Sequence, residues 1–452
     1  MSVTTILFSP VTRLSGLLSV KLLVDDGAII EANASGTLFR GFEYIMRDRH
    51  VTDAVYMTQR ICGICSTVHG AVASYLLDSL YDNDISENAQ YLRNVMLAAD
   101  FLQNHIRHFY FFGLPDFVIM PDRPPFQEQN CTDCRLNDED NRNMIRHHGE
   151  AVKVSQQCHQ LLALFGGKAP HQHSFVHGGV AVAPTADKIS QALSLIADIR
   201  AFVQCRLLAD TEILAQAYDD YFHIGISPRR LLSFGLFPMG PKNDRPTWRG
   251  GVLTDLGIKQ PNINFIEEDI TRSWYHRTAW PEEIAPAPHK EDAYSWTKSV
   301  LYQGRHFEGG PLARMIMNGF YSGGTSAMDR IVARSLETSL LADLAEKWLR
   351  AIEPGEPPLQ QKKDPVTDRV TAVTDAMRGP LLHSAQVKEE KIEQYNIITP
   401  TAWNFSPKDE TGSRGPVEAA LVGTAIPHPD LKYTIAGRII RSFDPCISCA
   451  TH

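Results

Sequence analysis

Four cysteines near the two ends of the chain have the spacing of metal ligands. Cys62 and Cys65 lie in the segment R-I-C-G-I-C-S-T-V-H, and Cys446 and Cys449 lie in D-P-C-I-S-C-A-T-H. Two cysteines at this spacing can bind one ion, so the two pairs together offer four sulfurs. Four thiolates suit a tetrahedral zinc or a thiolate-rich redox centre, and structural zinc is the more common of the two.

Two features of these segments argue against a structural zinc. The pairs are separated by almost the whole 452-residue chain, whereas structural zinc modules usually close locally. Side chains that can take part in chemistry also flank the pairs: Arg60, His69, Asp444 and His452. A metal that only staples the fold needs none of these side chains. The spacing therefore favours a redox centre and leaves zinc as the alternative.

The composition is that of a soluble globular protein. Lys and Arg number 44 and Asp and Glu 52, which gives a net charge of −8, and hydrophobic residues make up 43%. A net-acidic chain without basic clusters is not expected to bind nucleic acid. We find no apolar run long enough for a membrane span and no secretory signal over residues 1–10. Six of the eight cysteines fall in C-x-x-C pairs, which favours metal or redox chemistry in a reducing compartment.

Hydrophobic periodicity predicts long helices and a small N-terminal sheet. The turn signal Asp26-Gly27 between the apolar runs 17–23 and 28–34 predicts a β-hairpin. Apolar residues recur every three or four positions in three stretches, which predicts long helices over 85–112, 185–221 and 326–351. We therefore expect a predominantly helical α+β fold, with a core bundle of long helices and a small N-terminal β-sheet.

The motifs resemble those of one enzyme family. R-I-C-G-I-C-S-x-x-H, followed at the C-terminus by D-P-C-x-x-C-x-x-H, is similar to the large, catalytic subunit of nickel–iron hydrogenases. Four further segments resemble the same subunit: Thr37–Glu43, His105–Asp116, Gly166–Gly179 and Tyr395–Pro407. The resemblance covers nearly the whole chain and implies the hydrogenase large-subunit fold. Because both ends contribute ligands, we expect residues 1–452 to form one large domain.

The resemblance implies a nickel–iron centre on the four cysteines. Cys62 and Cys446 would bind nickel terminally, while Cys65 and Cys449 would bridge nickel to an iron that carries carbon monoxide and cyanide. Thiolates suit both metals and can bridge two of them, which imidazoles cannot do. The implied reaction is the heterolytic, reversible oxidation of dihydrogen to protons and electrons.

The same resemblance implies residues that handle the proton. The base would be the Cys446 thiolate or the guanidinium of Arg378, in A-M-R-G, and it must lie within hydrogen-bond reach of the reacting atoms. Asp116 and Asp444 match the carboxylates that hold this arginine. An Asp–Arg pair is a geometry that fixes a guanidinium in place.

Three more residues would support the centre. His69 lies one helical turn after Cys65 and would hydrogen-bond its sulfur. Glu43 and the last residue, His452, would help to bind a magnesium-like ion that holds the C-terminus. A chain that stops at this histidine resembles the mature form left by a C-terminal endopeptidase.

Two positions depart from the family's pattern. Ser15, in T-R-L-S-G-L, stands where the family has a proton-transferring glutamate, and Met377 replaces a proline before Arg378. A serine cannot ionise and relays a proton only as a hydroxyl between two partners. Our hypothesis is that Ser15 with water, or the pair of Arg378 with an aspartate, carries the proton.

The third pair, Cys131 and Cys134, has no role in the family's pattern. Nearby side chains offer the ligands of an additional metal site: His147, His148, Cys158 and His159. A surface loop with two unused thiols is the simpler interpretation. We interpret Cys158 and Cys205 as core residues of helices.

A large subunit alone has no exit for electrons, so the resemblance implies an iron–sulfur small subunit as partner, in a heterodimer that can be doubled. Maturation proteins and a C-terminal endopeptidase are further implied partners. One alternative is a dihydrogen sensor with slow turnover, which the loss of the glutamate at Ser15 would suit. Another is a zinc-stapled binding protein. A quinone-reductase subunit of related ancestry would lack the four thiolates. Localisation stays open between the cytoplasm and the membrane periphery, since a partner's signal can export the chain.

Overall fold

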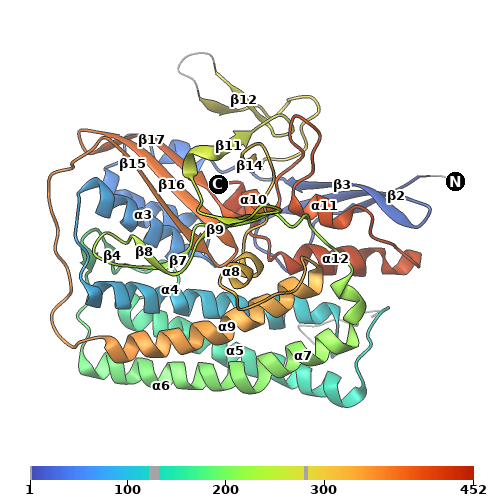
Figure 1. Cartoon of the computed structure of the whole chain (residues 1–452), viewed down its shortest axis with the longest axis horizontal. Helices are drawn as coiled ribbons and strands as arrows, with labels where there is room; N and C mark the ends of the chain where they lie inside the picture. The colour runs from blue at the N-terminus through green and yellow to red at the C-terminus, as the bar shows by residue number, and fades with distance from the viewer. Residues whose placement is uncertain (1–2, 122–131, 279–282) are drawn as a thin grey trace.

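The computed structural model describes residues 3–121, 132–278 and 283–452. Long helices pack as a bundle, in the lower half of Figure 1, around a shared hydrophobic core. They are α4 (Glu87–Arg107), α5 (Asp138–Gly166), α6 (Ala186–Phe202), α7 (Leu208–Ala217) and α9 (Ala327–Ala351). The predominantly helical α+β fold expected from the sequence is confirmed.

A second layer lies over α4. It consists of helix α3 (Ser66–Leu80) and an antiparallel sheet of three strands, β15 (Arg369–Ala376), β16 (Gly379–Lys388) and β17 (Lys391–Ile398). Helix α3 packs against β15 and β16 on one side and against α4 on the other. It is buried on almost every face, which explains why its apolar residues are not gathered in a single stripe.

The N-terminal sheet projects from the side of the molecule (Figure 1). Its strands β1 (Thr4–Phe8), β2 (Leu18–Asp25) and β3 (Ala28–Gly36) pair antiparallel in sequence order. The predicted hairpin is confirmed, because Asp26 and Gly27 both take positive φ (47° and 72°) at the turn. Strand β1 was not anticipated; it adds to the edge of β2.

Smaller elements connect these layers. The short helices are α1 (Phe42–Ile45), α2 (Ala54–Met57), α8 (Pro311–Met317), α10 (Pro400–Asn404), α11 (Pro416–Leu421), α12 (Lys432–Ser442) and α13 (Ile447–Ala450). The short strands form two-stranded and three-stranded sheets: β4 (Phe175–Val176) with β5 (Gly179–Val180), β6 (Leu231–Ser233) with β9 (Gly251–Thr254) and β10 (Gly257–Lys259), β7 (Leu236–Met239) with β8 (Arg245–Trp248), β11 (Ile266–Asp269) with β14 (Ser299–Tyr302), and β12 (Tyr275–Arg277) with β13 (Ile284–Pro286).

Two of the predicted helices change their hydrogen bonding part-way. Helix α4 continues into a π-helical turn over His108–Gly113, and α6 is joined to α7 by another over Val203–Leu207. The apolar spacing in both stretches fits a helix, so the sequence predicts one continuous element in each case. A π turn inserts an extra residue without breaking the helix, and this pattern does not reveal it.

The chain ends in the interior. The C-terminus lies near the middle of the molecule in Figure 1, beside the sheet β15–β17 and helix α10. Thr451 and His452 are both buried. The last helix, α13, therefore comes within reach of the loop before α3, although the two are separated by most of the sequence.

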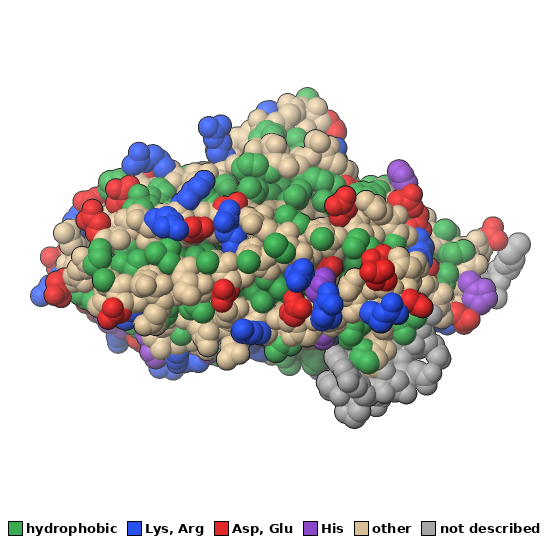
Figure 2. All heavy atoms as spheres, turned by 90° about the horizontal axis from the view of Figure 1, so that it is seen from below, with side chains coloured by type: hydrophobic (Ala, Val, Ile, Leu, Met, Phe, Trp, Pro, Cys, Tyr) green, Lys and Arg blue, Asp and Glu red, His purple; other side chains and the backbone are tan. Residues whose placement is uncertain are grey.

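Charged side chains of both signs are scattered among hydrophobic ones on the outer face of the helical bundle. Figure 2 views the molecule from below and shows Lys and Arg side chains interspersed with Asp and Glu. Arg200 of α6, for example, pairs with Asp343 of α9 at 2.5 Å. Such exposed pairs contribute little stability, about 0–1 kcal/mol each. Within the described ranges, no helix has both the length and the apolar character needed to cross a membrane.

Helix α9 begins with a capping box that makes a testable contribution to stability. The Ser326 hydroxyl accepts from the Asp329 N–H at 3.1 Å, and the Asp329 carboxylate accepts from the Ser326 N–H at 2.8 Å. We predict that Ser326→Ala lowers the free energy of unfolding by about 1 kcal/mol, because a buried helix terminus loses its partner. A thermal denaturation curve measures the change. Ser194→Ala, on the exposed face of α6, is the control and should leave the curve in place.

Candidate metal centre

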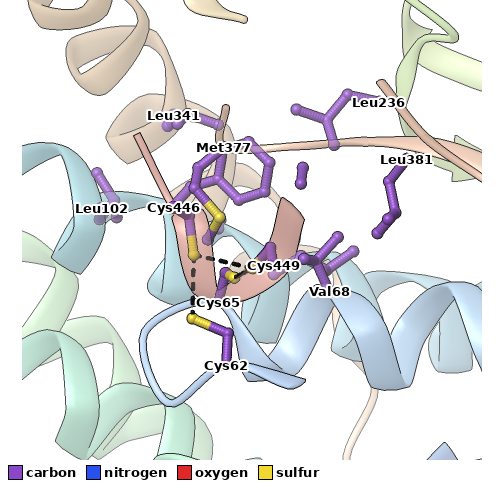
Figure 3. Packing of buried hydrophobic residues seen from close by; sticks show 14 of the residues in the cluster. Cys62, Cys65, Val68, Leu102, Leu236, Leu341, Met377, Leu381, Cys446 and Cys449 are labelled. Atoms are coloured by element: carbon purple, nitrogen blue, oxygen red, sulfur yellow. Dashed lines mark hydrogen bonds between the residues drawn. The ribbon is translucent and has the colours of Figure 1, made fainter. Parts of the chain in front are cut away.

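Four cysteine sulfurs meet in the interior between α3, α13 and the sheet β15–β17. Those of Cys62, Cys65, Cys446 and Cys449 all lie within 4.8 Å of one another and all four residues are buried. The Sγ–Sγ distance is 3.4 Å between Cys62 and Cys446, 3.2 Å between Cys65 and Cys449, and 2.9 Å between Cys446 and Cys449 (Figure 3). Among the described residues, this is the only group of three or more His, Cys, Asp or Glu side chains close enough to share an ion.

One cysteine of each pair lies directly before a helix. Cys65 directly precedes α3, and Cys446 directly precedes α13. Arg40 joins the two segments, because its Nη2 donates to the Ile61 carbonyl at 2.5 Å and also to the Ser448 carbonyl. Neither the position nor the role of Arg40 was anticipated, although it lies in a segment that resembles the family's.

The thiols influence one another's protonation. Hydrogen bonds from Cys446, Cys449 and Cys65, aided by the charge of Arg378, hold the pKa of Cys62 well below its usual range. The same shared bonds, together with burial, raise the pKa values of Cys65 and Cys449. A cluster of four sulfurs in a dry interior cannot carry four negative charges without cations. The donor set therefore fits soft metal ions, which would replace the shared protons.

Arg378 is fixed beside the centre. Its Nε donates to the Asp444 carbonyl at 2.6 Å, and its Nη2 donates to the Asp444 carboxylate at 2.9 Å and to Asn104 Oδ1 at 2.8 Å. Burial opposes ionisation of Asp444, but Arg378 and neighbouring cations hold its pKa at about 2. The predicted Asp444–Arg378 pair is thus present. The Nη1 group of Arg378 is buried and has no hydrogen-bond partner in the described chain.

Asp116 does not hold Arg378, and this expectation was wrong. Its carboxylate pairs instead with Arg13 and, at 2.7 Å, with Arg441 of α12. The π turn after α4 redirects the chain, so Asp116 faces α12 and Asn104 takes the place beside Arg378. Asn104 was missed, although it directly precedes His105 in the H-x-x-H-F-Y motif and lies on a helix face that the sequence predicts.

A second buried arginine fixes the backbone that carries Arg378. Arg314 of α8 donates to the carbonyls of Ala376 (2.9 Å) and Met377 (3.0 Å). Its charge is balanced by Glu337 at 2.6 Å and Asp375 at 3.0 Å. The turn between β15 and β16 is therefore held by side chains rather than by the proline that the family has at Met377.

His69 is buried next to the centre but bonds away from it. Its Nδ1 lies 3.2 Å from Nε2 of His383, whose Nδ1 lies 2.9 Å from the Tyr395 hydroxyl. The expected hydrogen bond to Cys65 is not among its contacts. Burial lowers the pKa of His69 to about 4, so the imidazole is neutral at physiological pH.

Ser15 lies against the cysteine cluster, as expected from the sequence. Its hydroxyl is 3.9 Å from the Cys62 sulfur and 3.3 Å from the Ser448 hydroxyl, and its carbonyl accepts from the Ile447 N–H at 2.7 Å. Gly16 makes this approach possible: it takes a positive φ of 88°, and a Cβ there would lie 2.4 Å from the backbone of Ser448.

Glu43 and His452 come together at the buried C-terminus. Nε2 of His452 is 3.5 Å from Glu43 Oε1, and its Nδ1 is 2.6 Å from the Cys449 carbonyl. Lys298 lies 3.4 Å from Glu43 and 3.0 Å from Glu268. Although burial opposes ionisation, Lys298 and His452 hold the pKa of Glu43 at about 2. A permanent carboxylate beside an imidazole fits a divalent ion such as magnesium.

The other cysteines take no part in this cluster. Cys131 lies outside the described residues, and Cys134 is disulfide-bonded, so it is neither an unused thiol nor a free ligand. Cys158 is buried in α5 as expected, but Cys205 is exposed, which corrects its interpretation as a core residue. His147 bonds to Asp210 at 2.9 Å rather than joining a metal site.

Comparison with protein families identifies the family of the chain that carries this cluster. A family model described as nickel-dependent hydrogenase matches residues 40–122, 122–324 and 321–452. The chain belongs to the nickel-dependent hydrogenase family. It is therefore an oxidoreductase that acts on dihydrogen, and a zinc-stapled binding protein is set aside.

Similar hydrogenases match this chain over its full length. The large subunit of the periplasmic [NiFeSe] hydrogenase of Desulfomicrobium baculatum is 32% identical over 98% of this chain and 94% of its own. The hydrogenase-2 large chain of Escherichia coli K12 is 28% identical over 99% and 97%. Among solved structures, the Ni-Fe-Se hydrogenase of D. vulgaris Hildenborough has a TM-score of 0.95 at 34% identity, covering all of both chains. This likeness confirms the hydrogenase large-subunit fold.

We predict that Cys449→Ala abolishes nickel binding. Removing one of four sulfurs leaves an incomplete ligand set, while the remaining thiols stay buried. Elemental analysis of the purified protein measures nickel per chain. Cys205→Ala removes an exposed cysteine outside the cluster and is the matched control. Nickel retained by Cys449→Ala at the wild-type level would contradict the assignment of this ligand.

Proposed function

We propose that this hydrogenase subunit cleaves dihydrogen heterolytically and reversibly, and passes the electrons to an iron–sulfur small subunit. The observation that carries the proposal is the group of four buried sulfurs from both ends of the chain, with a fixed guanidinium beside it. This arrangement offers thiolates for two metals and a positive charge next to them, in an interior that excludes bulk water.

Cys62, Cys65, Cys446 and Cys449 would hold the metals. By the resemblance to the family, Cys62 and Cys446 would be terminal ligands of nickel, and Cys65 and Cys449 would be shared with iron. A nickel–iron centre with carbon monoxide and cyanide on iron would supply the cleavage of dihydrogen. Because the sulfurs are buried, such a centre has to be installed before the C-terminal segment closes, which supports maturation proteins and a C-terminal endopeptidase as partners.

Arg378 stabilises negative charge at the centre and does not accept the proton. Although burial disfavours its charged form, Asp444 and the neighbouring thiols raise its pKa, so the guanidinium stays protonated. Its unpartnered Nη1 group is available to donate a hydrogen bond to a group at the centre. The Cys446 thiolate is then the first proton acceptor, and it can share the proton with Cys62, whose sulfur is 3.4 Å away.

Four supporting residues complete the proposal. Ser15 relays a proton from Cys62 to Ser448 as a hydroxyl, since it contacts both. His69 supports the centre as a neutral, buried imidazole. Glu43 and His452 bind a magnesium-like ion that holds the C-terminal segment in place.

An electron-accepting subunit is part of the proposal. The curated relatives are named as large subunits or large chains, which implies smaller partners for those proteins. In this chain, apolar side chains are exposed on the N-terminal sheet and next to it: Leu7, Leu17 and Ile30. A partner covering this face would remove them from water.

Dihydrogen sensing is the second candidate. The observation that favours it is Ser15, which cannot ionise where the family's proton-transferring glutamate is expected. A sensor would have the same metals and turn over slowly. Turnover of dihydrogen with a dye as electron acceptor separates the two, because an uptake enzyme sustains it at rates typical of enzymes, about 1–10³ per second.

We predict that the purified complex contains nickel, iron and magnesium, and shows infrared bands of carbon monoxide and cyanide. These bands report the iron ligands directly, without reference to activity. Elemental analysis measures the metals in the same sample. Zinc in place of nickel, with no such bands, would overturn the proposed function.

We predict that Ser15→Ala slows dihydrogen–deuterium exchange about tenfold, because a methyl group cannot relay a proton. The exchange measured by mass spectrometry needs no electron acceptor and therefore reports proton movement alone. Ser15→Thr keeps the hydroxyl and is the control. Full exchange in Ser15→Ala would show that the proton leaves by another group.

A further inference from the structure

One buried carboxylate on α9 contacts both of the groups that place Arg378. Glu337 is fully buried, and its Oε1 atom accepts from Arg314 Nε at 2.6 Å. Its Oε2 atom accepts from Arg314 Nη2 at 2.7 Å and lies 2.8 Å from Nε2 of His105 on α4. These two neighbours of Glu337 lead to opposite ends of Arg378.

The first route leads through Arg314 to the backbone before Arg378. Besides its bonds to Glu337, Arg314 donates from Nη1 to the Ala376 carbonyl at 2.9 Å and from Nη2 to the Met377 carbonyl at 3.0 Å. The donors of a guanidinium lie in one plane, so the carboxylate that holds Nε and Nη2 also sets where the remaining N–H groups point. Glu337 thereby fixes the two carbonyls that directly precede Arg378.

The second route leads through His105 to the guanidinium of Arg378. Burial lowers the pKa of His105, so the ring is neutral at physiological pH and its Nε2–H donates to the Glu337 carboxylate. Asn104 precedes His105 on α4; its amide accepts from Arg378 Nη2 at 2.8 Å and donates to Asp444 Oδ2 at 2.8 Å. The bond between His105 and Glu337 thus holds this turn of α4 against α9, with Asn104 on the guanidinium.

The carboxylate stays ionised within this cluster. Although burial opposes ionisation, Arg314 and His105 hold the pKa of Glu337 at about 2. Phe101 packs against both partners: its ring centroid is 5.5 Å from Cζ of Arg314 and 5.9 Å from the ring centroid of His105. The cluster is therefore charged, buried and closely packed, which restricts how far any of its members can move.

Stability alone does not account for these buried charges. A buried ion pair usually gains little over well-packed apolar side chains, because the desolvation of both charges offsets their attraction. What charged partners add is direction, since a guanidinium held by a carboxylate on one edge presents its other donors in fixed positions. The cluster around Glu337 therefore serves placement.

We propose that Glu337 is a positioning residue that fixes Arg378 at both ends. It holds the backbone of this arginine through Arg314, and the guanidinium through His105 and Asn104. The inference rests on the proposed function and deepens it, because there Arg378 stabilises negative charge at the centre. The Nη1 group of Arg378, which has no partner in the described chain, keeps one position only if both ends are held. Glu337 itself transfers neither a proton nor an electron.

The test compares Glu337→Gln with the wild type in the purified complex. Glutamine keeps the shape but loses the charge, and Asp375 still pairs with Arg314 at 3.0 Å, so the fold should be retained. We expect kcat for dihydrogen oxidation to fall about tenfold or more with KM unchanged, because the guanidinium no longer has a single position. Asp78→Asn is the matched control: it breaks the buried pair with Arg93 (2.6 Å) and should leave kcat unchanged.

A double-mutant cycle separates positioning from a merely structural role. Arg378→Lys keeps a positive charge beside Asp444 but has no planar fork. If Glu337 acts through Arg378, adding Glu337→Gln to Arg378→Lys should lower kcat by no more than about twofold further. A further tenfold loss in that background would overturn the inference, and so would a wild-type kcat in Glu337→Gln alone.

Two further measurements do not depend on turnover. The infrared bands of cyanide and carbon monoxide should broaden or shift in Glu337→Gln and keep their wild-type positions in Asp78→Asn. A crystal structure of Glu337→Gln should show Arg378 Nη2 farther from Asn104 Oδ1 than the 2.8 Å of the wild type. If Glu337→Gln does not form a complex, Arg314→Lys makes the same predictions, since three ammonium donors cannot serve two carbonyls and two carboxylates.

The outcomes separate this inference from the proposed function. A wild-type complex without nickel, infrared bands or turnover would overturn the proposed function alone, because the crystal structure still tests the placement of Arg378. An Arg378 side chain in its wild-type position in both Glu337→Gln and Arg314→Lys would overturn the inference.

Discussion

The structure depends on bringing two short loops together from opposite ends of the chain. Four sulfurs within 4.8 Å require residues 62–65 and 446–449 to meet in the interior. Arg40 joins the loops through the carbonyls of Ile61 and Ser448, and the N-terminal segment closes over them through Ser15. Such contacts join residues far apart in the sequence, so neither loop can form the cluster without the other. We infer from this that the chain folds as one domain.

Buried charge organises the surroundings of the centre. Arg314, Glu337 and Asp375 are fully buried and hold the turn that presents Arg378, while Asp444 and Asn104 fix its guanidinium. Breaking one buried pair of this kind costs about 3–5 kcal/mol, since the remaining partner is left uncompensated. The polar network therefore resists small displacements, and precise placement of a guanidinium is what an electrostatic role requires.

The sequence was sufficient to predict the metal ligands and the helices with strong apolar periodicity. Spacing and motif alone identified the four cysteines. Apolar repeats located α9, α4 with its π turn, and the run from α6 through α7 to within a few residues. The assignment of Asp116 to Arg378 failed because the π turn after Arg107 changes which way later side chains face. Helix α5 and the strands β15–β17 were not predicted, and neither were Arg40 and Asn104. The roles of Arg40 and Asn104 depend on contacts with residues more than 200 positions away, which a local sequence pattern does not contain.

The buried C-terminal segment ties the lifetime of the centre to the dynamics of the protein. Residues 446–452 are held by Arg40, by the carbonyl of Ser15 and by the contact of His452 with Glu43. A metal ion bound by the sulfurs can dissociate only when this segment opens, however tightly the thiolates bind it. The time for which the centre is retained is then set by the free energy of local unfolding of this segment. A substitution that loosens the segment would shorten that time without changing a ligand.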